Sequence, residues 1–176
     1  MLKELLQGAW LKHPLHPVVI SLPLGLWPIS LLLDGYSHAA GGSTVAVTGS
    51  FYALLVGLAG ALVAVATGLA DFSEIKPGKP ARKIGIQHMV LNATGTLFWI
   101  ASLALHLPAR NGQLSTTPVA AIICSGVALI ATCSAAYLGG RMVYNHGIGV
   151  ARYSKKRLRQ IAAAAGNNVP GEEEGA

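Results

Sequence analysis

Four long stretches without charge restrict what this chain can fold into. Asp, Glu, Lys and Arg are absent from residues 13–33, 35–70, 84–109 and 111–140. A helix needs roughly 20 apolar residues to cross a bilayer, and each stretch is long enough. A soluble bundle would need polar residues on its outer helix faces, which these stretches lack. The sequence therefore predicts an all-α, integral membrane four-helix bundle.

The predicted membrane domain covers residues 13–150. Its spans are expected at about residues 16–36, 45–70, 85–107 and 118–140. Residues 1–12 have the pattern of a short amphipathic helix at the membrane interface, with leucines on one face and charged residues on the other. Residues 151–176 form a basic and then acidic tail, which we expect to be cytoplasmic and disordered at its end.

Lysine and arginine predict the orientation of the spans. These residues precede span one, lie between spans two and three and follow span four, whereas Arg110 alone lies in the opposite loops. The positive-inside rule then places both termini in the cytoplasm, as in a multi-pass protein of the cell inner membrane. The net charge of +6 follows from this topology and from contact with anionic lipid, and we expect no nucleic-acid partner.

A polar pattern recurs in spans one and three. At offsets of seven, eleven, fourteen and eighteen residues, His16 is followed by Pro23, Trp27, Ser30 and Asp34. The same offsets lead from His88 to Gly95, Trp99, Ser102 and His106. Two duplicated helical hairpins, related by a two-fold axis along the membrane normal, would produce this pattern, and a chance recurrence is the alternative.

Each set of positions forms one stripe along its helix, because a helix turns about 100° per residue. Ionisable side chains inside spans are costly and usually face the bundle interior, so we expect both stripes to face inward. One group of polar residues falls at the cytoplasmic end: His13, His16, Asp71, His88, Tyr144 and His146. A second group, Asp34, His38 and His106, falls at the outer end.

Histidine is the commonest metal ligand among side chains and also an axial ligand of haem iron. His16 and His88 lie at the same depth on two parallel helices, which suits bis-histidine ligation of haem b. Alternatively, His13 and His16 join His88 or His146 around a transition metal, with Asp71 as a carboxylate ligand. Two roles without a metal are also open to the histidines. They can lie at the interface and bond to helix groups, or they can belong to a proton pathway from Asp34 to His16.

Several motifs resemble the bacterial domain-of-unknown-function 2231 family. They are His13-Pro14-Leu15-His16-Pro17, Gly68-Leu69-Ala70-Asp71, Gln87-His88 with Asn92, and residues 139–150 from Gly139 to Val150. The resemblance covers roughly residues 12–150 and implies a four-span membrane domain without an established activity. Some members of that family are fused to Rieske-type domains, which implies a redox setting. The positions that the resemblance implies as functional are His13, His16, Asp71, His88, Asn92, Tyr144 and His146.

These observations favour a small membrane protein that binds haem b or a transition metal for electron transfer. His16 and His88 are the first candidate ligands, and His13 and His146 come next. Asp71, Asn92 and Tyr144 would orient the imidazoles. A redox partner protein and a homodimer are the expected protein partners. The alternative is a non-catalytic membrane scaffold or assembly subunit. An enzyme is not expected, because phosphate-binding loops, nucleophile elbows and paired carboxylates are absent from the sequence.

Overall fold

The computed structural model describes residues 1–11, 13–148 and 164–166. Within these residues the chain is helical and contains no strand, which confirms the all-α prediction. The predicted cytoplasmic tail at residues 151–176 lies outside the described residues, apart from 164–166.

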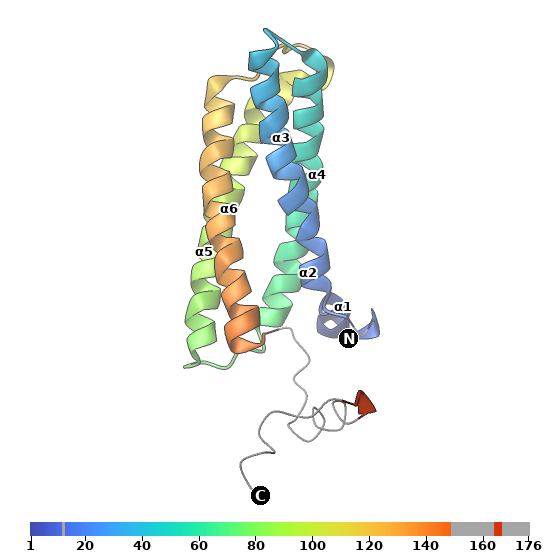
Figure 1. The fold of residues 1–176 in the computed structure, drawn as a ribbon, viewed down its shortest axis with the longest axis vertical. Coiled ribbons are helices and arrows are strands. Elements are labelled where there is room, and N and C mark those ends of the chain that lie inside the picture. Colours follow the sequence, from blue (N-terminus) through green and yellow to red (C-terminus); the bar gives the residue numbers. More distant parts are fainter. Residues whose placement is uncertain (12, 149–163, 167–176) are drawn as a thin grey trace, which may run out of the picture.

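Four long helical units lie side by side in an elongated bundle (Figure 1). They are α2 and α3 (Leu15–Val19 and Ser21–Ala39), α4 (Thr44–Phe72), α5 (Pro80–Leu105) and α6 (Val119–His146). Each unit is long and apolar enough to cross a membrane, and each overlaps one expected span. Their outer faces expose large apolar side chains, among them Leu32, Val45, Leu62, Leu97 and Ile130. Lipid is the solvent that such a surface requires.

Helix boundaries follow from residues with special backbone properties. Pro23 has no amide hydrogen to donate to the Val19 carbonyl. The helix is interrupted at that carbonyl, between the end of α2 at Val19 and the start of α3 at Ser21. The Ser43 hydroxyl accepts the Ala46 amide at 3.3 Å and so caps the start of α4. At its far end, α6 stops at Gly147, whose φ of 60° suits glycine.

Two short helices precede the bundle, namely α1 (Leu2–Leu6) and the 3-10 turn η1 (Ala9–Leu11). They lie beneath the end of α4. The Lys3 ammonium is 3.3 Å from the Glu74 carboxylate, and the Gln7 amide donates to Ala70 O at 3.5 Å. The N-terminal segment is therefore docked on the bundle by polar contacts. A further 3-10 turn, η2 (Leu107–Asn111), follows α5.

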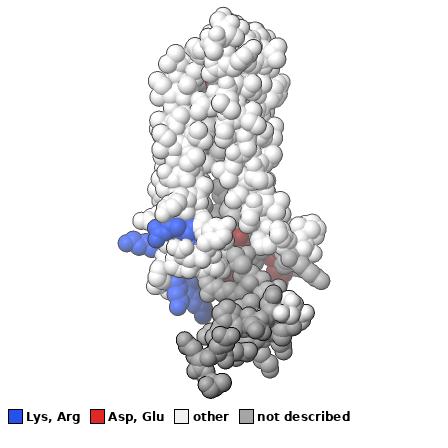
Figure 2. Space-filling view, viewed as in Figure 1, with Lys and Arg blue, Asp and Glu red and all other residues white. Residues whose placement is uncertain are grey.

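The two ends of the bundle differ in charge. In Figure 2 the visible Lys and Arg side chains gather at one end, near the start of α5. We call this end, where α2 and α5 begin and α4 and α6 end, the basic end; it holds Lys3, Lys76, Lys79, Arg82, Lys83 and Arg141. The opposite end, called the loop end, holds Arg110.

The bundle consists of two hairpins, α2–α3 with α4 and α5 with α6, whose equivalent residues meet. Trp27 and Trp99 hold equivalent places in the sequence pattern, and their rings stack with centroids 4.9 Å apart. Asp34 and His106, 72 residues apart, are also equivalent and are hydrogen-bonded. These two contacts are what two duplicated hairpins related by a two-fold axis would produce, and the duplication itself stays a prediction.

Glycines allow the helices of the first hairpin to approach closely. A Cβ atom on Gly57 would lie 2.5 Å from the Trp27 indole nitrogen, and one on Gly60 would lie 2.9 Å from Leu22. Helix association in lipid depends on such close packing of small residues. The apolar core at the centre of the bundle is built from Trp27, Leu54, Ala61, Trp99 and Ala128.

Candidate functional site

A buried acid–base pair lies near the loop end, where the two hairpins meet. Asp34 of α3 and His106, which caps α5, both have 0% of their surface exposed. The His106 Nε2 atom lies 2.9 Å from Asp34 Oδ1. Ionisable side chains are rare and costly at such depth in a membrane, and they usually mark a functional site. This pair is the centre of the candidate site.

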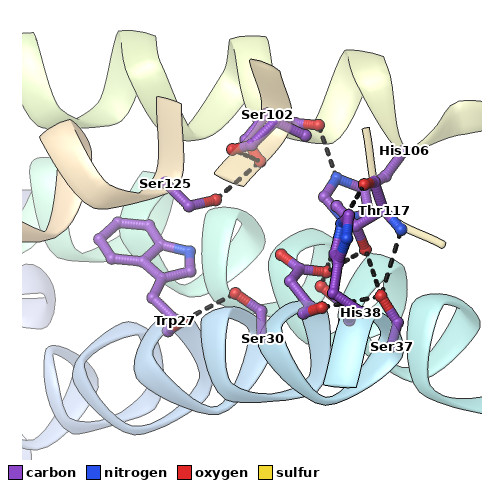
Figure 3. A network of polar contacts seen from close by, with 11 residues as sticks. Trp27, Ser30, Ser37, His38, Ser102, His106, Thr117 and Ser125 are labelled. Atoms are coloured by element: carbon purple, nitrogen blue, oxygen red, sulfur yellow. Dashed lines mark hydrogen bonds and ion pairs between the residues drawn. The ribbon is translucent and has the colours of Figure 1, made fainter. Parts of the chain in front are cut away.

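Hydroxyl groups of three residues surround the pair. Thr117, just before α6, donates to Asp34 Oδ1 at 2.8 Å. From α3, the Ser37 hydroxyl accepts the Thr117 amide at 3.2 Å and donates to the Asp34 carbonyl at 2.7 Å. Ser50 of α4 lies 3.4 Å from His106 Nε2. Both hairpins and the loop before α6 therefore contribute to one enclosed polar cluster (Figure 3).

A backbone contact fixes the hydrogen on one nitrogen of His106 and leaves the other nitrogen to share a proton with Asp34. His106 Nδ1 lies 2.8 Å from the Ser102 carbonyl, which can only accept, so Nδ1 carries a hydrogen. The remaining nitrogen, Nε2, faces Asp34. A proton between them belongs either to an imidazolium beside a carboxylate or to a neutral imidazole beside a carboxylic acid. These two states differ only in the position of one proton along a 2.9 Å contact.

Two buried polar atoms have no partner among the described residues, namely Asp34 Oδ2 and Trp27 Nε1. Buried polar groups are normally hydrogen-bonded, and an exception needs a physical reason. The pair already uses Asp34 Oδ1 for His106 and Thr117. Oδ2 is therefore available to take up a further proton or to bind water, without breaking either of these bonds.

An exposed histidine at the loop end is hydrogen-bonded to the buried cluster through Thr117. His38 is exposed, and its Nε2 donates to the Thr117 carbonyl at 2.7 Å. Figure 3 shows His38, Thr117, Ser37 and His106 side by side. All three residues predicted at the outer end, Asp34, His38 and His106, thus belong to one network that Thr117 joins.

The residues predicted at the cytoplasmic end lie at the basic end and are more dispersed. His16 is half-buried, and its Nδ1 donates to Ala64 O at 3.0 Å and to the Thr67 hydroxyl at 3.1 Å. His88 is also half-buried and donates from Nδ1 to Ala135 O at 2.7 Å. The predicted orienting role of Asn92 has a geometric counterpart, because its amide donates to His88 Nε2 at 2.9 Å.

The remaining predicted residues do not join a metal site. His13 is exposed, Tyr144 is 88% exposed, and Asp71 and His146 are half-buried at helix ends. In the described part of the chain, no three His, Cys, Asp or Glu side chains are placed to hold a metal ion. The cluster of His13, His16, His88 and His146, with Asp71, is therefore not assembled there. The reason is that His16 and His88 each bond to the second helix of their own hairpin.

Thr117, Ser37 and Ser50 were missed in the sequence, whereas Ser102 belongs to the stripe that was expected to face inward. Thr117 lies in a loop before Pro118, where periodicity carries no signal, and isolated serines are ordinary in membrane helices. One signal was present, however. Asp34 and His106 have the same offset from His16 and His88, and a two-fold axis between parallel helices makes equivalent inward positions face each other.

Comparison with known proteins gives one match. A family model described as "Predicted membrane protein (DUF2231)" matches residues 12–152, which is most of the chain. Neither a curated protein nor a solved structure matches.

Proposed function

The chain belongs to the DUF2231 family of predicted membrane proteins, and we propose that it transfers protons across the membrane through the buried Asp34–His106 pair. One observation carries the proposal. A carboxyl and an imidazole, both fully buried, share a hydrogen bond whose proton can reside on either side. Chains of Asp, Glu and His inside membranes commonly act as proton relays.

The cluster supplies an entry route at the loop end. His38 is exposed at this end, and an imidazole can both bind and release a proton. Thr117 bonds to His38 through its carbonyl and to Asp34 through its hydroxyl. The exposed imidazole and the buried carboxyl thus bond to the same residue, which keeps them close together at the loop end.

The stacked tryptophans interrupt the polar stripe toward the basic end. Trp27 and Trp99 fill the centre of the bundle, and Trp99 Nε1 donates to the Thr132 hydroxyl at 3.2 Å. Beyond them lie Thr67 and His16, which are hydrogen-bonded to each other. A barrier of this kind excludes an open water-filled pore, so the proposed transfer is slow and occurs in steps.

The orientation proposed from the sequence fits this arrangement. The basic end carries most of the described Lys and Arg, and the positive-inside rule places it in the cytoplasm. The buried pair then lies toward the outer face of a bacterial inner membrane. Anionic lipid of the cytoplasmic leaflet is the proposed partner of the basic end.

Proton flux in proteoliposomes tests the function. Purified protein is reconstituted, a pH gradient is imposed with potassium and valinomycin to dissipate charge, and a trapped dye reports internal pH. We expect wild-type protein to dissipate the gradient faster than empty liposomes do. Asp34→Asn keeps the shape and hydrogen-bonding capacity of the side chain but removes its charge, and we expect it to abolish the added flux.

Ser134→Ala is the matched control. Ser134 is exposed on α6, where its hydroxyl bonds only to Ile130 O, and its loss should leave the flux unchanged. His106→Gln serves as a second variant, with circular dichroism and gel filtration showing that both variants fold. If wild-type protein and Asp34→Asn give the same flux, the proton-transfer function is wrong. That result would favour the scaffold or assembly role instead.

Electron transfer is a second candidate function. It is favoured by the two equivalent histidines at the basic end, each of which donates Nδ1–H to a backbone carbonyl. This bond fixes the tautomer in which Nε2 is the metal-binding atom. The proposed redox partner would approach that end, and a homodimer stays a prediction.

A further inference from the structure

Two imidazoles occupy equivalent places near the basic end of the two hairpins. His16 donates to Ala64 O of α4, and His88 donates to Ala135 O of α6. Each ring also packs on a glycine four residues further along the helix that it bonds to. A Cβ atom on Gly68 would lie 2.9 Å from His16 Cε1, and one on Gly139 would lie 3.2 Å from His88 Cε1. The hairpins thus build the same histidine pocket twice.

From this geometry we infer that His16 and His88 form a two-histidine site for an iron tetrapyrrole such as haem b, between the two hairpins at the basic end. The inference does not depend on proton transfer. Eighteen helical residues separate this site from Asp34–His106, which is about 27 Å along a helix. It gives the second candidate function, electron transfer, a chemically defined ligand.

The number of available ligands favours a tetrapyrrole over a bare metal ion. A bare Zn or Cu ion usually needs three or four side-chain ligands. No group of three His, Cys, Asp or Glu side chains is placed to provide them within residues 1–11, 13–148 and 164–166. Haem iron receives four nitrogens from its macrocycle and needs two axial ligands from protein. Two histidines, one from each hairpin, match that number.

The protonation state of both rings suits an axial ligand. A carbonyl accepts the Nδ1 hydrogen in each case, so Nε2 holds the lone pair when the ring is neutral. Among the described residues, no side chain bonds to His16 Nε2. At His88 the Asn92 amide donates to Nε2 at 2.9 Å, so ligation requires the Asn92 side chain to turn away.

Burial along the stripes indicates which of their residues a ligand can reach. At the loop end the equivalent residues Ser30, Ser102, Asp34 and His106 are all 0% exposed. His16 and His88 belong to the same stripes but are only half-buried. The acid–base pair is therefore closed off from its surroundings, whereas the two histidines are partly accessible. A ligand that binds to both imidazoles needs this access.

Haem titration of the purified protein tests the inference. Haemin is added to wild-type protein in detergent, and the Soret band and the electron paramagnetic resonance spectrum are recorded. We expect saturable binding of one haem per chain with a low-spin spectrum, as two imidazole ligands produce. His16→Ala and His88→Ala should each convert the spectrum to high spin, and the double variant should lose saturable binding.

Matched variants separate ligation from general damage. His13→Ala and His146→Ala should bind haem as wild-type protein does, because neither belongs to the paired pockets. Gly68→Ala and Gly139→Ala should weaken binding by displacing an imidazole, whereas Gly126→Ala, with open space around it, should not. Equal spectra from wild-type protein and the His16→Ala/His88→Ala double variant would overturn the inference. They would show that haemin only partitions into detergent.

Discussion

His106 Nε2 lies 2.9 Å from Asp34 Oδ1, and the two residues hold the same position in their respective hairpins. The two hairpins place these equivalent positions in contact, so identical ionisable residues here would oppose each other. Two aspartates would repel as anions and two histidines as cations. An acid in one hairpin and a base in the other turn this repulsion into attraction, and the bundle gains one buried pair.

Exchanging the two residues tests this equivalence. Asp34→His and His106→Asp each place like groups together, and we expect each to lower the free energy of unfolding by about 3 kcal/mol, as breaking a buried pair usually does. The double exchange restores an acid opposite a base and should recover most of that loss. Thermal unfolding in detergent measures it. A double variant no more stable than the single ones would contradict the equivalence of the two positions.

Replacing both residues by leucine separates stability from proton transfer. Buried ion pairs contribute little net stability, and replacing them with apolar residues is often neutral or stabilising by about 1–4 kcal/mol. The Asp34→Leu/His106→Leu variant should therefore remain folded, with an unfolding temperature at or above that of wild-type protein. Its proton flux should equal that of empty liposomes. Retention of flux in this folded variant would show that protons take another route.

Gly57→Ala should disturb the tryptophan stack. The new Cβ would lie 2.5 Å from Trp27 Nε1, so the indole must move away from Gly57, which alters its stacking on Trp99. Overpacking of this kind typically costs about 1–3 kcal/mol. Near-ultraviolet circular dichroism should lose its tryptophan signal. In the control, Gly25→Ala, nothing lies within 4 Å of the new Cβ, and its stability should be unchanged or up to ~1 kcal/mol higher. Equal losses in both variants would contradict the close contact.

Docking of the N-terminal helix should depend on pH. Hydrogen bonds from Gln7 and Lys3 lower the pKa of the exposed Glu74 carboxyl below its ordinary value of 4.5. A lowered pKa means that the docked state favours the carboxylate, so docking is strongest above pH 4.5 and weakens as pH falls through the lower folded value. Amide hydrogen exchange in residues 1–11 should increase over that range. Glu74→Gln should remove this pH dependence, and an unchanged profile in that variant would contradict the assignment.

The fold was predictable because its determinants are local in sequence. Uncharged stretches long enough to span a bilayer define the helices, and the stripes from His16 and His88 define their inward faces. The sequence did not predict which group of polar residues would be fully buried. That depends on how the hairpins pack against each other, and the structure buries Asp34 and His106 rather than the histidines at the basic end. Thr117 acquires its role only when the loop before α6 folds over Asp34.

Solid-state ¹⁵N nuclear magnetic resonance of histidine-labelled protein in liposomes tests the central claim most directly. The claim is that the buried pair exchanges a proton with solvent through the loop end. The His106 signals, assigned by their loss in His106→Gln, should change between the neutral and imidazolium patterns as the buffer is taken from alkaline to acidic. In Asp34→Asn that change should shift or disappear, because the acceptor facing Nε2 has lost its charge. His106 signals that stay the same at every pH would contradict the claim, because they would show a permanently locked structural pair.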